Sequence, residues 1–143
     1  MTLRDDITTA LATAPETDFH FVRRHSFQDI LDRIAERFLK EGRRDLRYVW
    51  LWERFRNELT SSHPDDAVSA LESQLQPDER YWFLASDEHG KYWVADATGA
   101  GILTTLREMY CFEYYVVNRH MTWLICENHH CVLIEASAAT PTA

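Results

Sequence analysis

Apolar residues recur every three or four positions in the first half of the chain, a spacing typical of helices with one buried face. Three such residues predict a short helix over residues 2–13, which Ala14-Pro15 would end. Alternating aromatic residues then predict a short edge strand or extended arm over residues 18–22. A longer stripe predicts a helix that begins after a capping Ser26 and ends at Gly42. Its apolar members are Phe27, Ile30, Leu31, Ile34, Phe38 and Leu39.

Residues 45–59 allow two interpretations. Their apolar residues keep helical spacing, but residues 48–52 also have the composition of a strand. We favour a helix, because residues 53–59 contain no strand signal and continue the 3.6-residue period of a helix. We expect a loop over residues 60–64 and then a short helix that is capped by an aspartate and extends to Leu75.

The sequence changes at Arg80, where aromatic and β-branched residues begin to gather in short runs bounded by turn residues. These runs predict two hairpins and a fifth strand, with a helix from about residue 102 to residue 109 after the first hairpin. We expect Gly99-Ala100-Gly101 to form a turn before that helix. The expected strands are residues 81–86, 91–95, 112–117, 123–126 and 131–134.

This succession of elements predicts an α+β fold. N-terminal helices would pack on one face of a four- to five-stranded antiparallel sheet, and the C-terminal half would have the order ββαβββ. Residues 113–117 alternate only in part, so we also expect some strands to be covered on both sides. A chain of 143 residues fits one domain. We expect residues 1–136 to form that single domain and residues 137–143, which are small and polar, to form a disordered tail.

Charge narrows the classes of partner. The net charge is −8, and residues 61–143 account for all of it, with 4 Lys+Arg against 12 Asp+Glu. Such a balance repels phosphate backbones and attracts basic surfaces, so we expect no nucleic-acid partner and favour a basic protein as the partner. No apolar run approaches the roughly 18 residues that cross a bilayer, and the N-terminus is acidic. We therefore expect no membrane partner and a cytoplasmic location.

Three cysteines, Cys111, Cys126 and Cys131, are an odd number without the spacing of a disulfide framework, which suits a reducing compartment. Thiols, imidazoles and a carboxylate gather between Cys126 and Cys131, and all three groups bind zinc or iron. The candidate metal ligands are Cys126, His129, His130 and Cys131. Because neighbours in a strand point to opposite faces, we favour the other interpretation, in which the cysteines are small buried residues and Glu127–His130 is a polar turn. We expect no metal and no cofactor.

Acid–base chemistry is a further alternative, because imidazoles and carboxylates could meet at one end of the sheet. The candidates are Asp87, Asp96, Glu113, Glu127, His129 and His130. The sequence contains neither a Gly-x-Ser-x-Gly nucleophile motif nor a phosphate-binding glycine loop. A catalytic role is therefore not our leading interpretation.

The sheet half contains the strings YWFLASDEHGKYWV, CFEYYVV and WLICENHHCVLI. It resembles a group of small, mostly uncharacterised bacterial proteins that carry a domain-of-unknown-function label, in which an "FEYY-V" segment leads into "WLLCENHH". The matching positions are residues 81–86, 92–94, 112–117 and 123–130. The resemblance implies a fold and a bacterial origin but no activity. Many small acidic bacterial proteins of this kind are similar to immunity partners of polymorphic toxins.

We therefore predict a non-catalytic protein-binding module, of an immunity or antitoxin-like kind, that occludes a basic partner with an acidic and aromatic face. Exposed tryptophan and tyrosine beside acidic groups are typical of interface hot spots. The candidate partner-binding residues are Asp87, Glu88, Trp93, Glu113, Trp123, Glu127, His129 and His130. The alternative is a small metal-dependent or acid–base enzyme that uses the Cys126–Cys131 segment, and a homodimer through an exposed strand fits either function.

Overall fold

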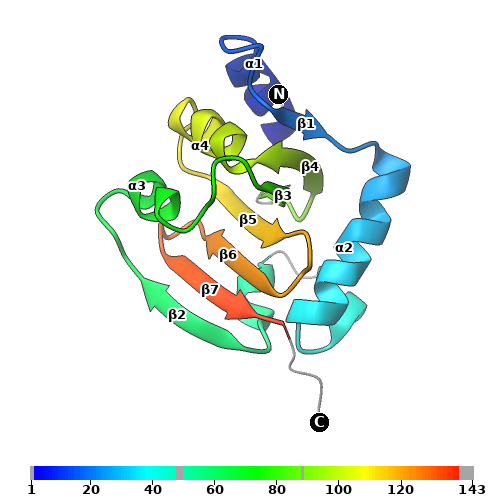
Figure 1. Cartoon of the computed structure of the whole chain (residues 1–143). Helices are drawn as coiled ribbons and strands as arrows, with labels where there is room; N and C mark the ends of the chain where they lie inside the picture. Colours follow the sequence, from blue (N-terminus) through cyan, green and yellow to red (C-terminus); the bar gives the residue numbers. More distant parts are fainter. Residues whose placement is uncertain (1, 48–49, 88, 139–143) are drawn as a thin grey trace.

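One antiparallel sheet organises the chain. The computed structural model describes residues 2–47, 50–87 and 89–138, and in this part of the chain seven strands pair in the order β1-β4-β3-β5-β6-β7-β2 (Figure 1). The strands are β1 (Phe19–Phe21), β2 (Glu58–Ser62), β3 (Arg80–Ser86), β4 (Tyr92–Thr98), β5 (Glu113–Asn118), β6 (Trp123–Glu127) and β7 (Leu133–Ser137).

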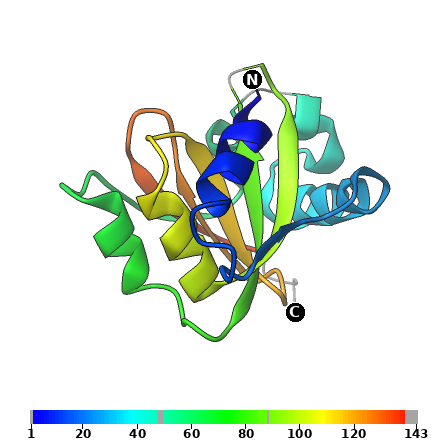
Figure 2. The same ribbon diagram turned by 90° about the horizontal axis from the view of Figure 1, so that it is seen from above.

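Helices cover both faces of this sheet, as Figure 2 shows with the strands nearly edge-on. On one face, here called the α4 face, lie α1 (Leu3–Leu11), α3 (Ala67–Glu72) and α4 (Gly99–Arg107). On the other, the α2 face, lie α2 (Arg24–Phe38) and the 3-10 helices η1 (Gly42–Arg47) and η2 (Leu51–Arg54). The helices therefore do not all lie on one face, and the expectation that some strands are covered on both sides is confirmed. The reason is visible in β5, which is buried along nearly its whole length and needs cover on both sides.

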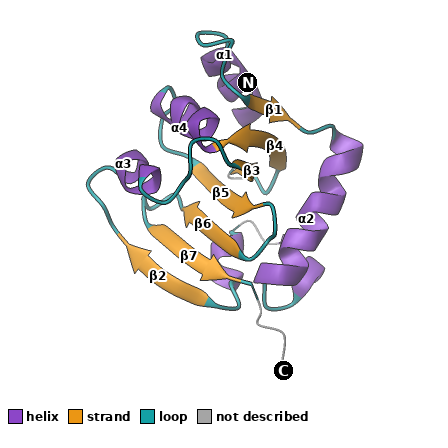
Figure 3. Ribbon diagram, in the orientation of Figure 1, coloured by secondary structure: helices purple, strands orange, loops and turns teal. Residues whose placement is uncertain are grey.

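The α+β class and the ββαβββ order of the C-terminal half are confirmed (Figure 3). The strand count is corrected from four or five to seven, because both edge strands come from the first half of the chain. β1 pairs with β4 at one edge and β2 pairs with β7 at the other. At the C-terminal end, Ser137 belongs to β7, and the Ala138 N–H donates to the Thr122 carbonyl, so the sheet extends past residue 136. Residues 139–143 of the expected tail lie outside the described part.

The helix predicted over residues 45–59 is wrong. The described part of this segment contains the end of η1, η2 and the start of β2, which extends through residues expected to be a loop. The buried Asp45 carboxylate accepts hydrogen bonds from the Glu41 N–H at 2.7 Å and from Arg54 Nε at 2.9 Å, and these bonds fix the irregular path. Leu59, which completed the helical period, lies 58% exposed on the edge strand β2, so its spacing carried no information about burial.

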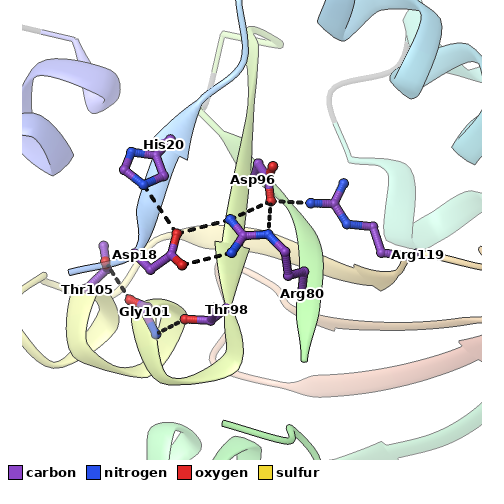
Figure 4. Close-up of polar contacts among 8 residues, drawn as sticks. All are labelled: Asp18, His20, Arg80, Asp96, Thr98, Gly101, Thr105 and Arg119. Carbon is purple, nitrogen blue, oxygen red and sulfur yellow. Dashed lines mark hydrogen bonds and ion pairs between the residues drawn. The ribbon is translucent and has the colours of Figure 1, made fainter. Parts of the chain in front are cut away.

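The glycines expected to form a turn instead lie in the first turn of α4. The Thr98 side chain caps this helix by accepting a hydrogen bond from the Gly101 N–H at 3.0 Å (Figure 4). A Cβ atom on Gly101 would lie 2.1 Å from the carbonyl oxygen of Asp18. Glycine is therefore required at this position for the close approach of α4 to the segment before β1.

An ion-pair network ties the β1 edge to the centre of the sheet (Figure 4). Arg80 donates to both carboxylate oxygens of Asp18, at 2.8 and 3.0 Å, and to Asp96 at 3.0 Å. Asp96 also pairs with Arg119, whose guanidinium lies 3.5 Å from the centre of the Trp82 ring. The hydrogen bond from Arg80 lowers the pKa of Asp18 below its usual value. Among the described residues, no helix is both long and apolar enough to cross a membrane.

Candidate functional site

A cavity of about 660 Å³ opens at the end of the sheet where β3 ends and β5 begins. It lies at the opposite end of β3 from the ion-pair network of Arg80, so Asp96 takes no part in it. We call it the Glu113 cavity. The residues that line it are Thr2, Leu3, Asp6, Trp50, Ser86, Asp87, His89, Lys91, Tyr110, Phe112, Glu113 and His129.

Glu113 is a buried carboxylate that three side chains hold in place. Its Oε1 accepts a hydrogen bond from Trp52 Nε1 at 2.9 Å and lies 3.3 Å from His129 Nδ1. Its Oε2 accepts a hydrogen bond from the Tyr115 hydroxyl at 2.8 Å. Burial is the main cause of a pKa for Tyr115 well above its ordinary value, so this hydroxyl remains a neutral donor. A buried carboxylate is stable only with such partners, and they fix its orientation at the cavity wall.

His129 connects Glu113 to the surface. The ring of Trp50 stacks on the imidazole with 4.8 Å between centroids, and the His130 ring lies 4.0 Å away. With its proton on Nδ1, the imidazole donates to Glu113, and Nε2 is left as the acceptor. The side chain of His129 is 38% exposed, so the pair is accessible from the cavity.

Asn128 builds the turn that carries these histidines. Its side-chain oxygen accepts hydrogen bonds from the backbone N–H groups of His130 at 2.9 Å and Val132 at 3.1 Å. Its own N–H donates to the Val132 carbonyl, and Cys131 takes a positive φ of 61° within the loop. The expected pattern, in which polar side chains of this turn bind local backbone, is present at Asn128.

The Glu113 cavity combines negative charge with aromatic surface. The carboxylates of Asp6, Asp87 and Glu113 line it, and among the lining residues that the structure describes Lys91 carries the one ammonium group. The Tyr110 hydroxyl donates to Asp6 at 2.7 Å, and this hydrogen bond raises the pKa of Tyr110 to about 12. Trp50 and Tyr110 remain 42% and 59% exposed, which is unusual for such large rings.

The residues predicted to bind a partner do not share one face. Asp87, Glu113 and His129 meet in the Glu113 cavity, with His130 beside them. The other described candidates lie elsewhere, and Glu88 lies outside the described residues. Glu127 is buried on the α4 face, Trp123 donates to Glu135 at the far end of β6, and Trp93 lines a second cavity of about 900 Å³.

The structure also separates the four candidate metal ligands. Cys126 is fully buried in the α2-face core, and burial is the main cause that raises the pKa of its thiol well above the ordinary value. Cys131 lies in the turn beside Cys111 instead, with 3.2 Å between the sulfur atoms. The histidines face Trp50 and Trp52.

Comparison with protein families places the chain in a group. A family model described as a family of unknown function matches residues 1–143. The chain belongs to DUF6756. No curated protein and no solved structure matches it. The description of DUF6756 names no activity, so the function of this DUF6756 chain has to be argued from its own side chains.

Sequence reasoning missed much of the aromatic part of this site in the DUF6756 chain. The helix favoured over residues 45–59 counted Trp50 among its regularly spaced apolar residues and gave Trp52 no role. The two-residue spacing of these tryptophans within a strand-like run was a sign that they could share one side of an extended segment. Tyr115 was counted among the aromatics of the sheet without a partner. Its bond to Glu113 links residues two positions apart on one strand, which alternation along the strand allows.

Proposed function

We propose that this protein is a non-catalytic binding module that receives a cationic side chain of a basic protein partner in the Glu113 cavity. The observation that carries the proposal is the lining of that cavity, where the carboxylates of Asp6, Asp87 and Glu113 lie beside the exposed rings of Trp50 and Tyr110. An ammonium or guanidinium group is the ligand chemistry that both kinds of group attract.

Charge and exposure support the same assignment. A cation over an aromatic ring gains about 0.5–2 kcal/mol, and the larger value applies where water is excluded. The three donors to Glu113 hold its carboxylate in position before a ligand arrives. Binding therefore costs little conformational entropy at this side chain. The negative charge of residues 61–143, which include the cavity-wall residues Asp87, Tyr110 and Glu113, would attract a basic partner over long range.

The finer form of the proposal is an immunity or antitoxin-like role, in which the bound chain occludes a basic partner in the bacterial cytoplasm. The resemblance of the FEYY and CENHH segments to such small bacterial proteins motivates this form. Self-association through an edge strand would be compatible with it, because β2 is exposed along its whole length.

Calorimetric titration with short peptides of defined charge tests the proposal. A tetra-arginine peptide should bind, with an affinity that falls as salt is added, and a tetra-glutamate peptide should not. Trp50→Ala and Asp87→Asn should each weaken arginine-peptide binding about tenfold, which corresponds to about 1.4 kcal/mol. The asparagine keeps the side-chain oxygen that accepts hydrogen bonds from the backbone of His89 and Lys91, so this change removes charge and preserves the turn.

Leu59→Ala supplies the control, because Leu59 is an exposed apolar residue on the edge strand β2 and does not line the Glu113 cavity. It should leave the affinity unchanged. Equal affinity for the two peptides, or equal loss in all three variants, would overturn the proposal.

A second candidate function rests on one observation, the contact of 3.3 Å between His129 Nδ1 and a Glu113 oxygen. A carboxylate that orients an imidazole in this way prepares its other nitrogen as a general base. Hydrolysis of p-nitrophenyl acetate and p-nitrophenyl phosphate tests it. An acid–base enzyme predicts turnover that His129→Gln removes and His130→Gln retains, whereas the absence of turnover with both substrates removes the support for this candidate.

A further inference from the structure

Two cysteines and a buried carboxylate meet on the α4 side of the sheet, in a group that we call the Cys111 cluster: Cys111, Glu127 and Cys131. Cys111 precedes β5, Glu127 ends β6, and Cys131 lies in the turn after it. The two sulfur atoms are 3.2 Å apart, and Cys111 Sγ lies 4.0 Å from Glu127 Oε2. One ligand atom from each residue lies within 4.8 Å of the others.

A second observation points to a ligand here. The hydroxyl of Tyr114, on a side chain only 1% exposed, has no hydrogen-bond partner among the residues that the structure describes. Tyr114 is the cross-strand neighbour of Glu127. The two side chains therefore lie on the same face of the sheet, and the Tyr114 hydroxyl forms no hydrogen bond with the Glu127 carboxylate. A buried hydroxyl left unpaired costs free energy, so a site that accommodates it needs an explanation.

We propose that the Cys111 cluster binds one divalent ion of the zinc type, with two sulfur ligands, one carboxylate oxygen and a fourth position open to solvent. Zinc takes sulfur at about 2.3 Å and carboxylate oxygen at about 2.0–2.2 Å in a tetrahedron, which sets the ligand atoms roughly 3.5–3.8 Å apart. Two observed separations, 3.2 Å between the sulfur atoms and 4.0 Å between Cys111 Sγ and Glu127 Oε2, lie within about half an ångström of that requirement. The third, between Cys131 and Glu127, is within 4.8 Å, so this pair would close by up to roughly 1 Å on binding. The Tyr114 hydroxyl is then available as an outer donor to a ligand atom.

Charge balance is favourable for a dication. Once the two thiols are deprotonated, they and the Glu127 carboxylate carry three negative charges, of which a divalent ion neutralises two. On binding, two S–H bonds break and two metal–sulfur bonds form, and the two protons pass to the buffer. Nothing is oxidised or reduced in this step. Cys111 is exposed and Cys131 half-exposed, so the ion has a path to the ligands.

This site differs from the Glu113 cavity and from the ligand set expected from sequence. Glu113 lies on the α2 face, because it bonds Tyr115 and Trp52, whereas Tyr114 and Glu127 lie on the α4 face. The cysteines of the Cys111 cluster are Cys111 and Cys131, and the fully buried Cys126 takes no part in it. Cys126 is therefore a matched control, since it is a thiol of the same chain on the opposite face of the sheet.

The experiment is a titration of the reduced, metal-free protein with Zn²⁺ and with Co²⁺ as a spectroscopic probe. We expect one equivalent of either ion, release of two protons, a thiolate-to-cobalt charge-transfer band and a melting temperature raised by Zn²⁺. Cys111→Ser and Cys131→Ser should each abolish the cobalt band, and Glu127→Gln should weaken binding at least tenfold. Cys126→Ala should retain the band and the stoichiometry.

Three outcomes would overturn the assignment. The first is the absence of a cobalt band in the reduced wild-type protein. The second is loss of the band in Cys126→Ala to the same extent as in Cys111→Ser, with both variants folded by circular dichroism. The third is isolation of the protein with Cys111 and Cys131 joined in a disulfide that forms in air and that zinc does not prevent, because the pair would then be a redox couple.

Discussion

The three donors on Glu113 give a sharp test of how the candidate binding site is built. The perturbation is a double-mutant cycle of Glu113→Gln and Tyr115→Phe. Tyr115 is 1% exposed and donates to Glu113 Oε2 at 2.8 Å, so its hydroxyl depends on that acceptor. A hydrogen bond to a charged group contributes about 1.5–3 kcal/mol, and we expect Tyr115→Phe to destabilise the wild-type protein by about 2 kcal/mol.

Glutamine keeps the shape of the side chain but brings an NH₂ group among three donors. Its oxygen can still face Trp52 and His129, which leaves the NH₂ group facing the Tyr115 hydroxyl. We therefore expect Glu113→Gln to cost about 2–3 kcal/mol, because it removes charge from every bond and removes the acceptor of Tyr115. In the Glu113→Gln background, Tyr115→Phe should cost less than about 1 kcal/mol. The difference from its cost in the wild-type protein is a coupling energy of at least about 1 kcal/mol.

Urea unfolding followed by circular dichroism measures all four proteins. A loss of 2 kcal/mol also lowers the melting temperature of a chain this size by roughly 7 °C, which calorimetry would detect. Tyr110→Phe is the matched control, because that hydroxyl bonds Asp6 at the exposed surface and should cost less than about 0.5 kcal/mol. Strict additivity of the two changes would refute the argument that Tyr115 and Glu113 form one buried unit.

Three further predictions concern the frame around the site. Gly101→Ala should destabilise the fold by about 3 kcal/mol in urea unfolding, because the new Cβ would lie 2.1 Å from the Asp18 carbonyl oxygen. The control Ala100→Ser, on the exposed side of the same helix, should change the free energy of unfolding little. Asp18→Asn should flatten the loss of stability in acid. The hydrogen bond from Arg80 lowers the pKa of Asp18 in the folded state. The contribution of Asp18 to the free energy of unfolding is therefore fully present above about pH 4 and is lost as the pH falls through the lowered pKa. Unfolding curves from pH 5 to about pH 2 would record this loss. Asn128→Ala should cost about 2 kcal/mol by calorimetry, because it removes the acceptor of two backbone N–H groups, and an unchanged melting temperature would contradict this account of the turn.

Local patterns predicted the parts of the fold that local interactions determine. The apolar stripe of α2 and the hairpin of β3 and β4 were recognisable because each signal lies within one stretch of chain. The short edge strand expected over residues 18–22 is present as β1, whereas the other edge strand, β2, was harder to predict. β2 is exposed along its whole length, so its sequence has no alternation to detect, and its partner β7 lies about half the chain length further on.

The candidate site shows the same division. A sheet end rich in acids, histidines and aromatics was predictable from composition, but one of the three partners of Glu113, Trp52, is 61 positions away. The alternation used to judge the Cys126–Cys131 segment assumed a continuous strand. The strand ends at Glu127, and Cys131 adopts a positive φ in a turn. A side chain in a turn does not follow strand alternation, so the position of Cys131 beside Cys111 could not be derived.

The placement of the two outer strands has a consequence for how the chain is made. β1 and β2 leave the ribosome before their pairing partners, which are β4 and β7 respectively. The first sixty or so residues therefore emerge with no sheet to join, and α2 emerges before most of the strands that it covers. Contacts between such distant segments make folding slow and leave apolar surface uncovered while synthesis continues. Chains that end before β7 would leave β2 and β6 without their pairing partner. Such fragments are natural substrates for chaperones and proteases.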